Sequence, residues 1–118
     1  MVTRRRYKLP LYGVPYDVYV VDTVEEARGI YPEYDEGYAA MVTYEDDYSQ
    51  LRMIFRSDAL SPAVTAHECV HLADRVCVLL GIKADAENDE PLAYVVQYIY
   101  GTAESAQNAH KVGKIKNI

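Results

Sequence analysis

Two histidines and a glutamate lie at a spacing that can hold a metal ion and use it. The segment His67-Glu68-Cys69-Val70-His71 places the imidazoles four residues apart, so on a helix both project from one face, one turn apart. Zinc binds imidazole nitrogen, and two histidines at this spacing can share one Zn²⁺ without distorting the helix. Glu68 would then be the general base toward a zinc-bound water, whose pKa falls to about 7. The pentapeptide therefore predicts a hydrolytic Zn²⁺ site.

A catalytic zinc ion needs a third protein ligand and an open coordination position. Glu90 is the predicted third ligand, because it begins the next predicted helix and that helix can pack back toward His71. The positive end of the helix dipole also favours a glutamate there without any metal. The competing carboxylates are Asp74, Asp85 and Asp89. Of these, Asp74 follows His71 on the same helix and is better placed to orient a ligand histidine by a hydrogen bond.

Two long helices must position these residues. Ser61-Pro62 supplies an N-cap and a first-turn proline, helical periodicity continues to Leu80, and Gly81 supplies the stop. Asn88-Asp89 caps a second helix that we expect to run from Glu90 to about Ala106, so the metal-site helices span about residues 61–106. The last dozen residues are polar and are expected to fray. The residues expected to face the core from the first helix are Ala66, Cys69, Val70, Ala73, Val76, Cys77 and Leu80.

The first half of the chain predicts strands around one short helix. The predicted strands are Tyr16–Val21, Tyr38–Tyr44 and Gln50–Arg56. Thr23 and Glu26 have capping-box spacing for a short helix over Val24–Ile30, and Glu45-Asp46-Asp47 is a polar turn between the last two strands. These two strands therefore predict an antiparallel hairpin. We expect an α+β domain in which a small antiparallel sheet of about three strands packs on two long C-terminal helices.

Length and charge restrict the class of protein and its partners. The chain has 118 residues and a net charge of −6, which suits one domain over residues 1–118 and argues against generic binding of nucleic acid. No apolar run is long enough to span a membrane, and no apolar segment follows the basic start as in a secretory signal, so a cytoplasmic protein is expected. Basic residues gather at both ends, where they could contact an acidic partner but are expected to form solvated tails. They are Arg4, Arg5, Arg6, Lys8, Lys111, Lys114 and Lys116.

The two cysteines are expected to be free. Cys69 and Cys77 fall on one predicted helix, where they would lie about 12 Å apart, too far for a disulfide. We expect both to be small core residues.

The pattern of His67-Glu68-x-x-His71 followed by Glu90 on the next helix resembles the gluzincin branch of the zincins. That resemblance implies zinc bound by His67, His71 and Glu90, with Glu68 as the general base. More narrowly, residues 67–74 together with residues 88–98 resemble short phage or prophage metallopeptidase-like proteins, which keep only the sheet and two helices of a minimal zincin. The resemblance covers about residues 61–100, and a phage-encoded protein would act in the host cytoplasm.

The sequence departs from the thermolysin-like pattern in two respects. Those enzymes have an aspartate four residues after the ligand glutamate that orients a histidine, whereas Tyr94 stands there in this chain, so that role is vacant or passes to Asp74. Tyr94 and Tyr98 could line the site or pack against the first helix. The larger enzymes also have a second domain that supplies an oxyanion-stabilising histidine or tyrosine. Here the local candidates are His110 and the tyrosines.

Three functions compete on these observations. The first is a zinc-dependent metallopeptidase that hydrolyses a peptide bond in a protein or peptide substrate, which would add as an extra strand at Leu51–Arg56 or a neighbouring strand. The second is a non-catalytic, zinc-stabilised binding or inhibitor module of the phage type. The third is a structural domain without a metal, against which the ligand spacing argues.

Overall fold

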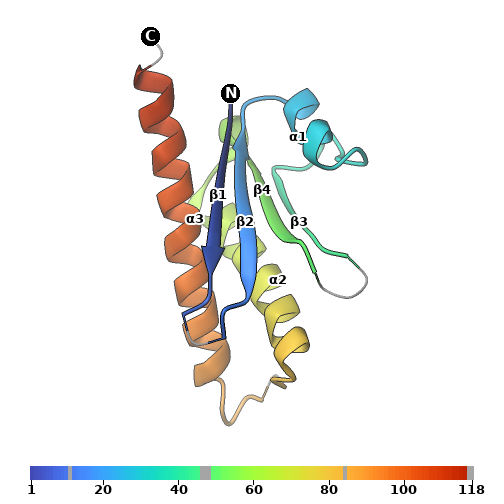
Figure 1. Cartoon of the computed structure of the whole chain (residues 1–118), viewed down its shortest axis with the longest axis vertical. Coiled ribbons are helices and arrows are strands. Elements are labelled where there is room, and N and C mark those ends of the chain that lie inside the picture. Colours follow the sequence, from blue (N-terminus) through green and yellow to red (C-terminus); the bar gives the residue numbers. More distant parts are fainter. Residues whose placement is uncertain (11, 46–48, 84, 117–118) are drawn as a thin grey trace.

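Four strands form one mixed sheet, in the order β1-β2-β4-β3 (Figure 1). The computed structural model describes residues 1–10, 12–45, 49–83 and 85–116. The strands are β1 (Val2–Lys8), β2 (Pro15–Val21), β3 (Ala40–Thr43) and β4 (Leu51–Arg56). β1 and β2 are antiparallel, β2 and β4 are parallel, and β3 and β4 are antiparallel.

The α+β class and the β3–β4 hairpin are confirmed, but the expectation of an antiparallel sheet of about three strands is wrong. The central pair is parallel because the chain crosses from β2 through a helix and β3 before it returns to β4, as a parallel connection requires. The β3 strand is shorter than the predicted Tyr38–Tyr44. The turn expected at Glu45-Asp46-Asp47 lies partly outside the described residues.

The basic N-terminal segment is a strand and not a solvated tail. β1 pairs with β2 along its whole length. The side chains of β1 alternate between the two faces of the sheet, although its run of arginines hides this in the sequence. Thr3 and Tyr7 face the helices. Arg4 and Arg6 lie on the other face, where each donates to the Asp17 carboxylate at 3.3 Å. Charged side chains on an edge strand also discourage pairing with another chain.

The helices begin where the capping signals predict. α1 (Val24–Ile30) has the capping box of Thr23 and Glu26. A short 3₁₀ turn, η1 (Ser57–Ala59), leads into α2 (Pro62–Leu80), where the Ser61 hydroxyl accepts from the Val64 N–H. Gly81 ends α2 in the left-handed conformation at φ 72°, which glycine adopts without a Cβ clash. Among the described residues, no helix is long and apolar enough to cross a membrane.

The last helix, α3 (Glu90–Lys116), is longer than predicted. The expected fraying after Ala106 is wrong, because Ala106 and His110 are buried and hold this part of the helix on the sheet. The His110 ring bonds the Thr3 hydroxyl through Nδ1 and the Asp22 carboxylate through Nε2, both at 2.8 Å. The basic C-terminal residues are therefore helical, not a loose tail.

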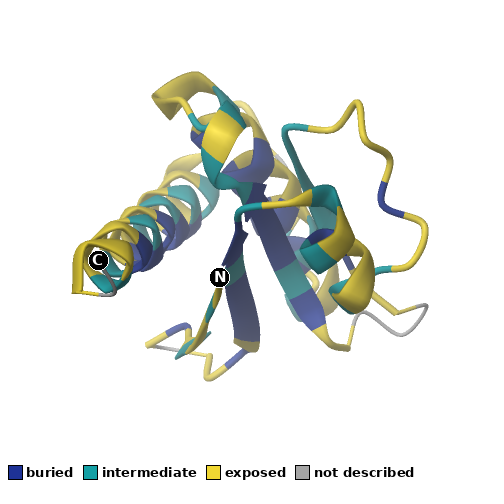
Figure 2. Cartoon of the chain, turned by 90° about the horizontal axis from the view of Figure 1, so that it is seen from above, coloured by how far each residue is buried: buried dark blue, intermediate teal, exposed yellow. Residues whose placement is uncertain are grey.

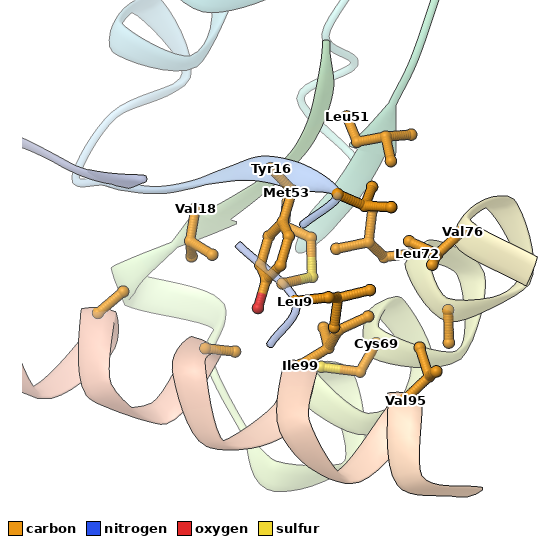
Figure 3. Close-up of a cluster of buried hydrophobic side chains, with 14 of the residues drawn as sticks. Leu9, Tyr16, Val18, Leu51, Met53, Cys69, Leu72, Val76, Val95 and Ile99 are labelled. Atoms are coloured by element: carbon orange, nitrogen blue, oxygen red, sulfur yellow. The ribbon is translucent and has the colours of Figure 1, made fainter. Parts of the chain in front are cut away.

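Both long helices pack on one face of the sheet. The main core lies between them and the sheet, and Figure 3 shows it filled by side chains of β2, β4, α2 and α3. A second, smaller core under α1 covers part of the other face and contains Val21, Ala27, Tyr34 and Ile54. Seen from above in Figure 2, the two central strands, β2 and β4, and the inner sides of the long helices are buried, whereas β1 and the outer sides of the helices are largely exposed.

The buried side of α2 is rotated from the side that the sequence pattern predicts. Its buried residues are Thr65, Glu68, Cys69, Leu72, Ala73, Val76 and Cys77. Ala66 and Val70, expected in the core, are exposed, Val70 by 52%. Both cysteines are free and buried, as predicted. This rotation places His67 and His71 on an exposed edge of the helix, beside β3.

This rotation predicts different costs for two substitutions on α2. Leu72→Ala should lower the free energy of unfolding by about 2–5 kcal/mol, because Leu72 is fully buried in the main core. Val70→Ala, the matched control, should change it by less than about 0.5 kcal/mol, as expected for an exposed site. Urea unfolding followed by circular dichroism measures both. Equal losses for the two variants would contradict the observed rotation.

Candidate metal centre

A groove of about 690 Å³ lies between α2 and the β3 side of the sheet. One wall is formed by residues 37–42 and 44, and the other by residues of α2. The α2 residues are Ala63, Val64, His67, Glu68, His71 and Arg75. Ala63, His67, His71 and Arg75 are four residues apart and Val64 and Glu68 lie beside them, so the six form one stripe along the helix. The predicted histidine pair and Glu68 therefore lie in the middle of this groove.

The two histidines are arranged as ligands of one ion. The Nε2 atoms of His67 and His71 are 3.2 Å apart, and the rings are tilted by 75°. Two nitrogens bound to one tetrahedral zinc at 2.0–2.1 Å would be separated by about 3.3 Å. The His67 side chain is 69% exposed, so an ion can reach the pair from solvent. The donor atoms and their separation fit zinc with little movement.

Glu68 approaches the same point from the inner side of the helix. Glu68 is 8% exposed, and its Oε1 lies 3.9 Å from His67 Nε2. Burial raises the pKa of this carboxyl, although the two histidines act in the opposite direction. The ligand atoms of His67, Glu68 and His71 all lie within 4.8 Å of one another. They could hold one metal ion, and no other group of three such residues occurs in the described part of the chain.

The structure does not bring Glu90 to the histidines. α2 continues beyond His71 to Leu80, about 13 Å farther along its axis, before the chain reverses. Glu90 therefore begins α3 at the far end of α2. It lines a different hollow, of about 890 Å³, together with Tyr94 and Tyr98. The third-ligand arrangement that the resemblance to gluzincins implies is not formed here.

The other predicted participants also lie elsewhere. Asp74 is exposed and lines a hollow beside Cys77, and no hydrogen bond joins it to either histidine among the described residues. Asp85 accepts hydrogen bonds from nearby backbone in the loop before α3. Asp89 lies at the exposed start of α3, and Tyr94 is 65% exposed beside Glu90. None of these side chains lines the groove of the histidine pair.

His110, predicted as an oxyanion candidate, belongs to a buried structural network. It bridges Thr3 and Asp22, and Asp22 also accepts from Ser57 at 2.6 Å and Lys114 at 3.1 Å. Burial alone would raise the pKa of Asp22, but these hydrogen bonds outweigh it and lower the pKa well below its ordinary value. The network joins the end of α3 to β1, β2 and η1. It stabilises the fold and leaves His110 unavailable to the groove.

Arg75 is a part of the groove that was not predicted from the sequence, and β3 was covered only as an unnamed neighbour of Leu51–Arg56. Arg75 lies four residues after His71, so it continues the histidine stripe by one more turn. Its guanidinium lies 4.6 Å from the centre of the Tyr44 ring, within the range of a cation–π contact. The i, i+4, i+8 spacing of His67, His71 and Arg75 was the available signal.

Comparison of the chain with protein-family models, with curated proteins and with solved structures found no match.

Zinc affinity distinguishes the observed donor set from the predicted one. His67→Ala should weaken zinc binding by more than about 100-fold, beyond the effect of losing a supporting partner. Glu90→Gln should leave the affinity unchanged, because Glu90 lies outside the cluster. Competition with a chromophoric chelator gives both dissociation constants. A large loss in Glu90→Gln would show that Glu90 is a ligand after all.

The buried Glu68 predicts a pH-dependent stability of the metal-free protein. Because its pKa is raised in the folded state, the folded chain holds this proton more tightly than the unfolded chain does. This contribution to stability is present below the ordinary pKa of 4.5 and is lost as the pH rises through the folded pKa. Glu68→Gln should therefore raise the melting temperature at pH 7 and give little gain near pH 4. Thermal melts of chelator-treated protein test this, with the exposed Glu104→Gln as control; a gain that is the same at both pH values would contradict it.

Proposed function

We propose that this chain is a zinc-dependent peptidase in which His67 and His71 bind the metal and Glu68 is the general base. The observation that carries the proposal is the 3.2 Å separation of the two Nε2 atoms with the Glu68 carboxylate beside them, in a groove open to solvent. When bound, zinc supplies a Lewis acid for the substrate carbonyl and lowers the pKa of a bound water. The chain's own residues then have to position the peptide and move the proton.

Glu68 is suited to the proton transfer. Its raised pKa makes the carboxylate a stronger proton acceptor than an exposed glutamate. Its burial beside Cys69 and Leu72 on α2 restricts the rotamers that it can adopt. A carboxylate in this place can accept a proton from the attacking water and return it to the leaving amine.

The edge of β3 supports a peptide substrate. β3 is the last strand of the sheet and pairs with β4 on one side, and its residues Ala40, Met41 and Val42 line the groove. An extended peptide can add to such an edge through main-chain hydrogen bonds. The sequence placed this addition at Leu51–Arg56 or a neighbour. β4 is internal, so the neighbour, Ala40–Thr43, is the strand available.

A zinc-stabilised binding module is the less favoured reading of the same residues. Structural zinc sites are closed by four protein ligands. Here the described residues bring together two histidines and the Glu68 carboxylate, one donor fewer than a closed structural site needs even if Glu68 were a ligand, and the His67 side chain is largely exposed. Such a site leaves positions free for water and substrate, as catalysis requires.

The proposal predicts a separation of zinc binding from hydrolysis. Zinc-loaded protein should cleave a mixture of internally quenched peptides, and Glu68→Gln should lower the rate by about 100-fold or more, the scale of general-base catalysis. The variant should retain stoichiometric zinc, measured by atomic emission. Glu104→Gln, on the exposed side of α3, is the matched control and should keep the wild-type rate. Hydrolysis that survives in Glu68→Gln, or zinc-loaded wild type that cleaves no peptide, would refute the proposal.

A further inference from the structure

The groove has a defined direction. α2 follows β4 through η1 and runs beside the sheet in the direction opposite to β4. Because β3 is antiparallel to β4, α2 and β3 run in the same direction. The start of α2, at Ala63 and Val64, therefore faces residues 37–39. The histidines lie beside the middle of β3, and the contact of Arg75 with Tyr44 marks the other end.

Arg75 is a cation with no carboxylate partner among the described residues. It makes no ion pair in that part of the chain, and its guanidinium lies over the Tyr44 ring. Of the described residues that line the groove, Glu68 is the one acid, and it lies beside His67. A partly buried arginine that no described carboxylate neutralises is complementary to an anion. The planar fork of arginine matches a carboxylate in particular.

The distance of Arg75 from the histidines determines which substrate residue it would contact. It lies one turn beyond His71, about 6 Å along the helix and about 12 Å beyond His67. An extended peptide advances about 3.3 Å per residue. The guanidinium is therefore about two or three residues from a peptide bond held at the histidine pair.

We propose that Arg75 determines specificity by binding a substrate carboxylate two or three residues from the scissile bond. This inference rests on the proposed function. Tyr44 holds the guanidinium by packing against it, so Arg75 is oriented before the substrate arrives. The groove would thus select peptides that carry a negative charge on the Tyr44 side of the cut.

The carboxylate can come from an acidic side chain or from the C-terminus, and the direction of the substrate decides which. A peptide antiparallel to β3 enters with its N-terminal side at Tyr44, so the carboxylate belongs to an aspartate or glutamate before the cut. A peptide parallel to β3 brings its C-terminal side there, so the terminal carboxylate becomes available as well.

Three matched peptide sets test the inference with zinc-loaded protein. The first carries one acidic residue and an amidated C-terminus, the second has no acidic residue and a free C-terminus, and the third has neither charge. Wild type should cleave one or both charged sets about 10–100-fold faster than the neutral set, the ratio expected for a charge-assisted hydrogen bond. Preference for the first set alone supports an acidic side chain, and preference for the second supports terminal recognition.

Substitution of Arg75 completes the test. In Arg75→Gln the ratio of charged to neutral cleavage should fall close to one while zinc affinity is unchanged, and Arg75→Lys should restore part of the ratio. Lys83→Gln removes a positive charge outside the groove and should leave the ratio as in wild type. A ratio that is unchanged in Arg75→Gln, or a wild type without preference, overturns the inference.

A parallel binding measurement separates this inference from the proposed function. Fluorescence anisotropy of the same peptides with zinc-loaded Glu68→Gln protein needs no turnover. If no peptide is cleaved, the peptidase proposal fails, and binding alone decides the role of Arg75. Tighter binding of charged peptides that is lost in Glu68→Gln/Arg75→Gln supports the carboxylate site; equal binding of all three sets overturns it.

Discussion

The packing of α2 against the sheet is the constraint on which the rest of the groove depends. Leu72 and Val76 are fully buried between the helix and the strands, and their burial fixes the rotation of α2 about its axis. Because interiors are close-packed, that rotation cannot drift by a few degrees without opening a void. His67 and His71 consequently emerge beside β3, with their Nε2 atoms already at the separation of two ligands of one ion. The position of this candidate metal site thus follows from which side of the helix must be buried.

The same rotation explains the unusual environment of Glu68. It occupies a core-facing position on α2, where a charged side chain is costly unless it is paired. In the metal-free protein its neighbours are two histidines, and its pKa is raised by burial. A bound dication would compensate this carboxylate. The buried carboxylate therefore lowers the stability of the metal-free fold, and metal binding would offset that loss. Ionisable groups with pKa values shifted in this way are typical of functional sites.

Local signals in the sequence were enough to locate the elements of the site but not to assemble them. Ser61-Pro62, Gly81 and the Thr23–Glu26 capping box each act within a few residues, and the helices begin or end where they indicate. The parallel pairing of β2 with β4 and the place of Glu90 depend on contacts distant in sequence. The arginines of β1 hid its alternation, since side chains on one face of an edge strand can be charged without loss of pairing.

The sequence pattern did not predict which side of α2 is buried. Val70 and Leu72 are both apolar and lie near the boundary of the helical arc, and only packing against β2 and β4 buries Leu72 and exposes Val70. Glu90 was predicted beside His71 and is not there for a related reason. A ligand on the next helix has to lie at the same height along α2 as His71, but α2 continues from His71 to Leu80, about two and a half turns, before the chain reverses. The two histidines lie side by side as expected, because both are on one helix, whereas their binding of zinc stays a prediction.

The most direct test of the central claim is a crystal structure of zinc-loaded protein with anomalous diffraction measured at the zinc absorption edge. The account predicts one anomalous peak within about 2.1 Å of the Nε2 atoms of both His67 and His71, with Glu68 facing it and Glu90 distant. A zinc ion bound to other residues, or protein that takes up no zinc under these conditions, would contradict it.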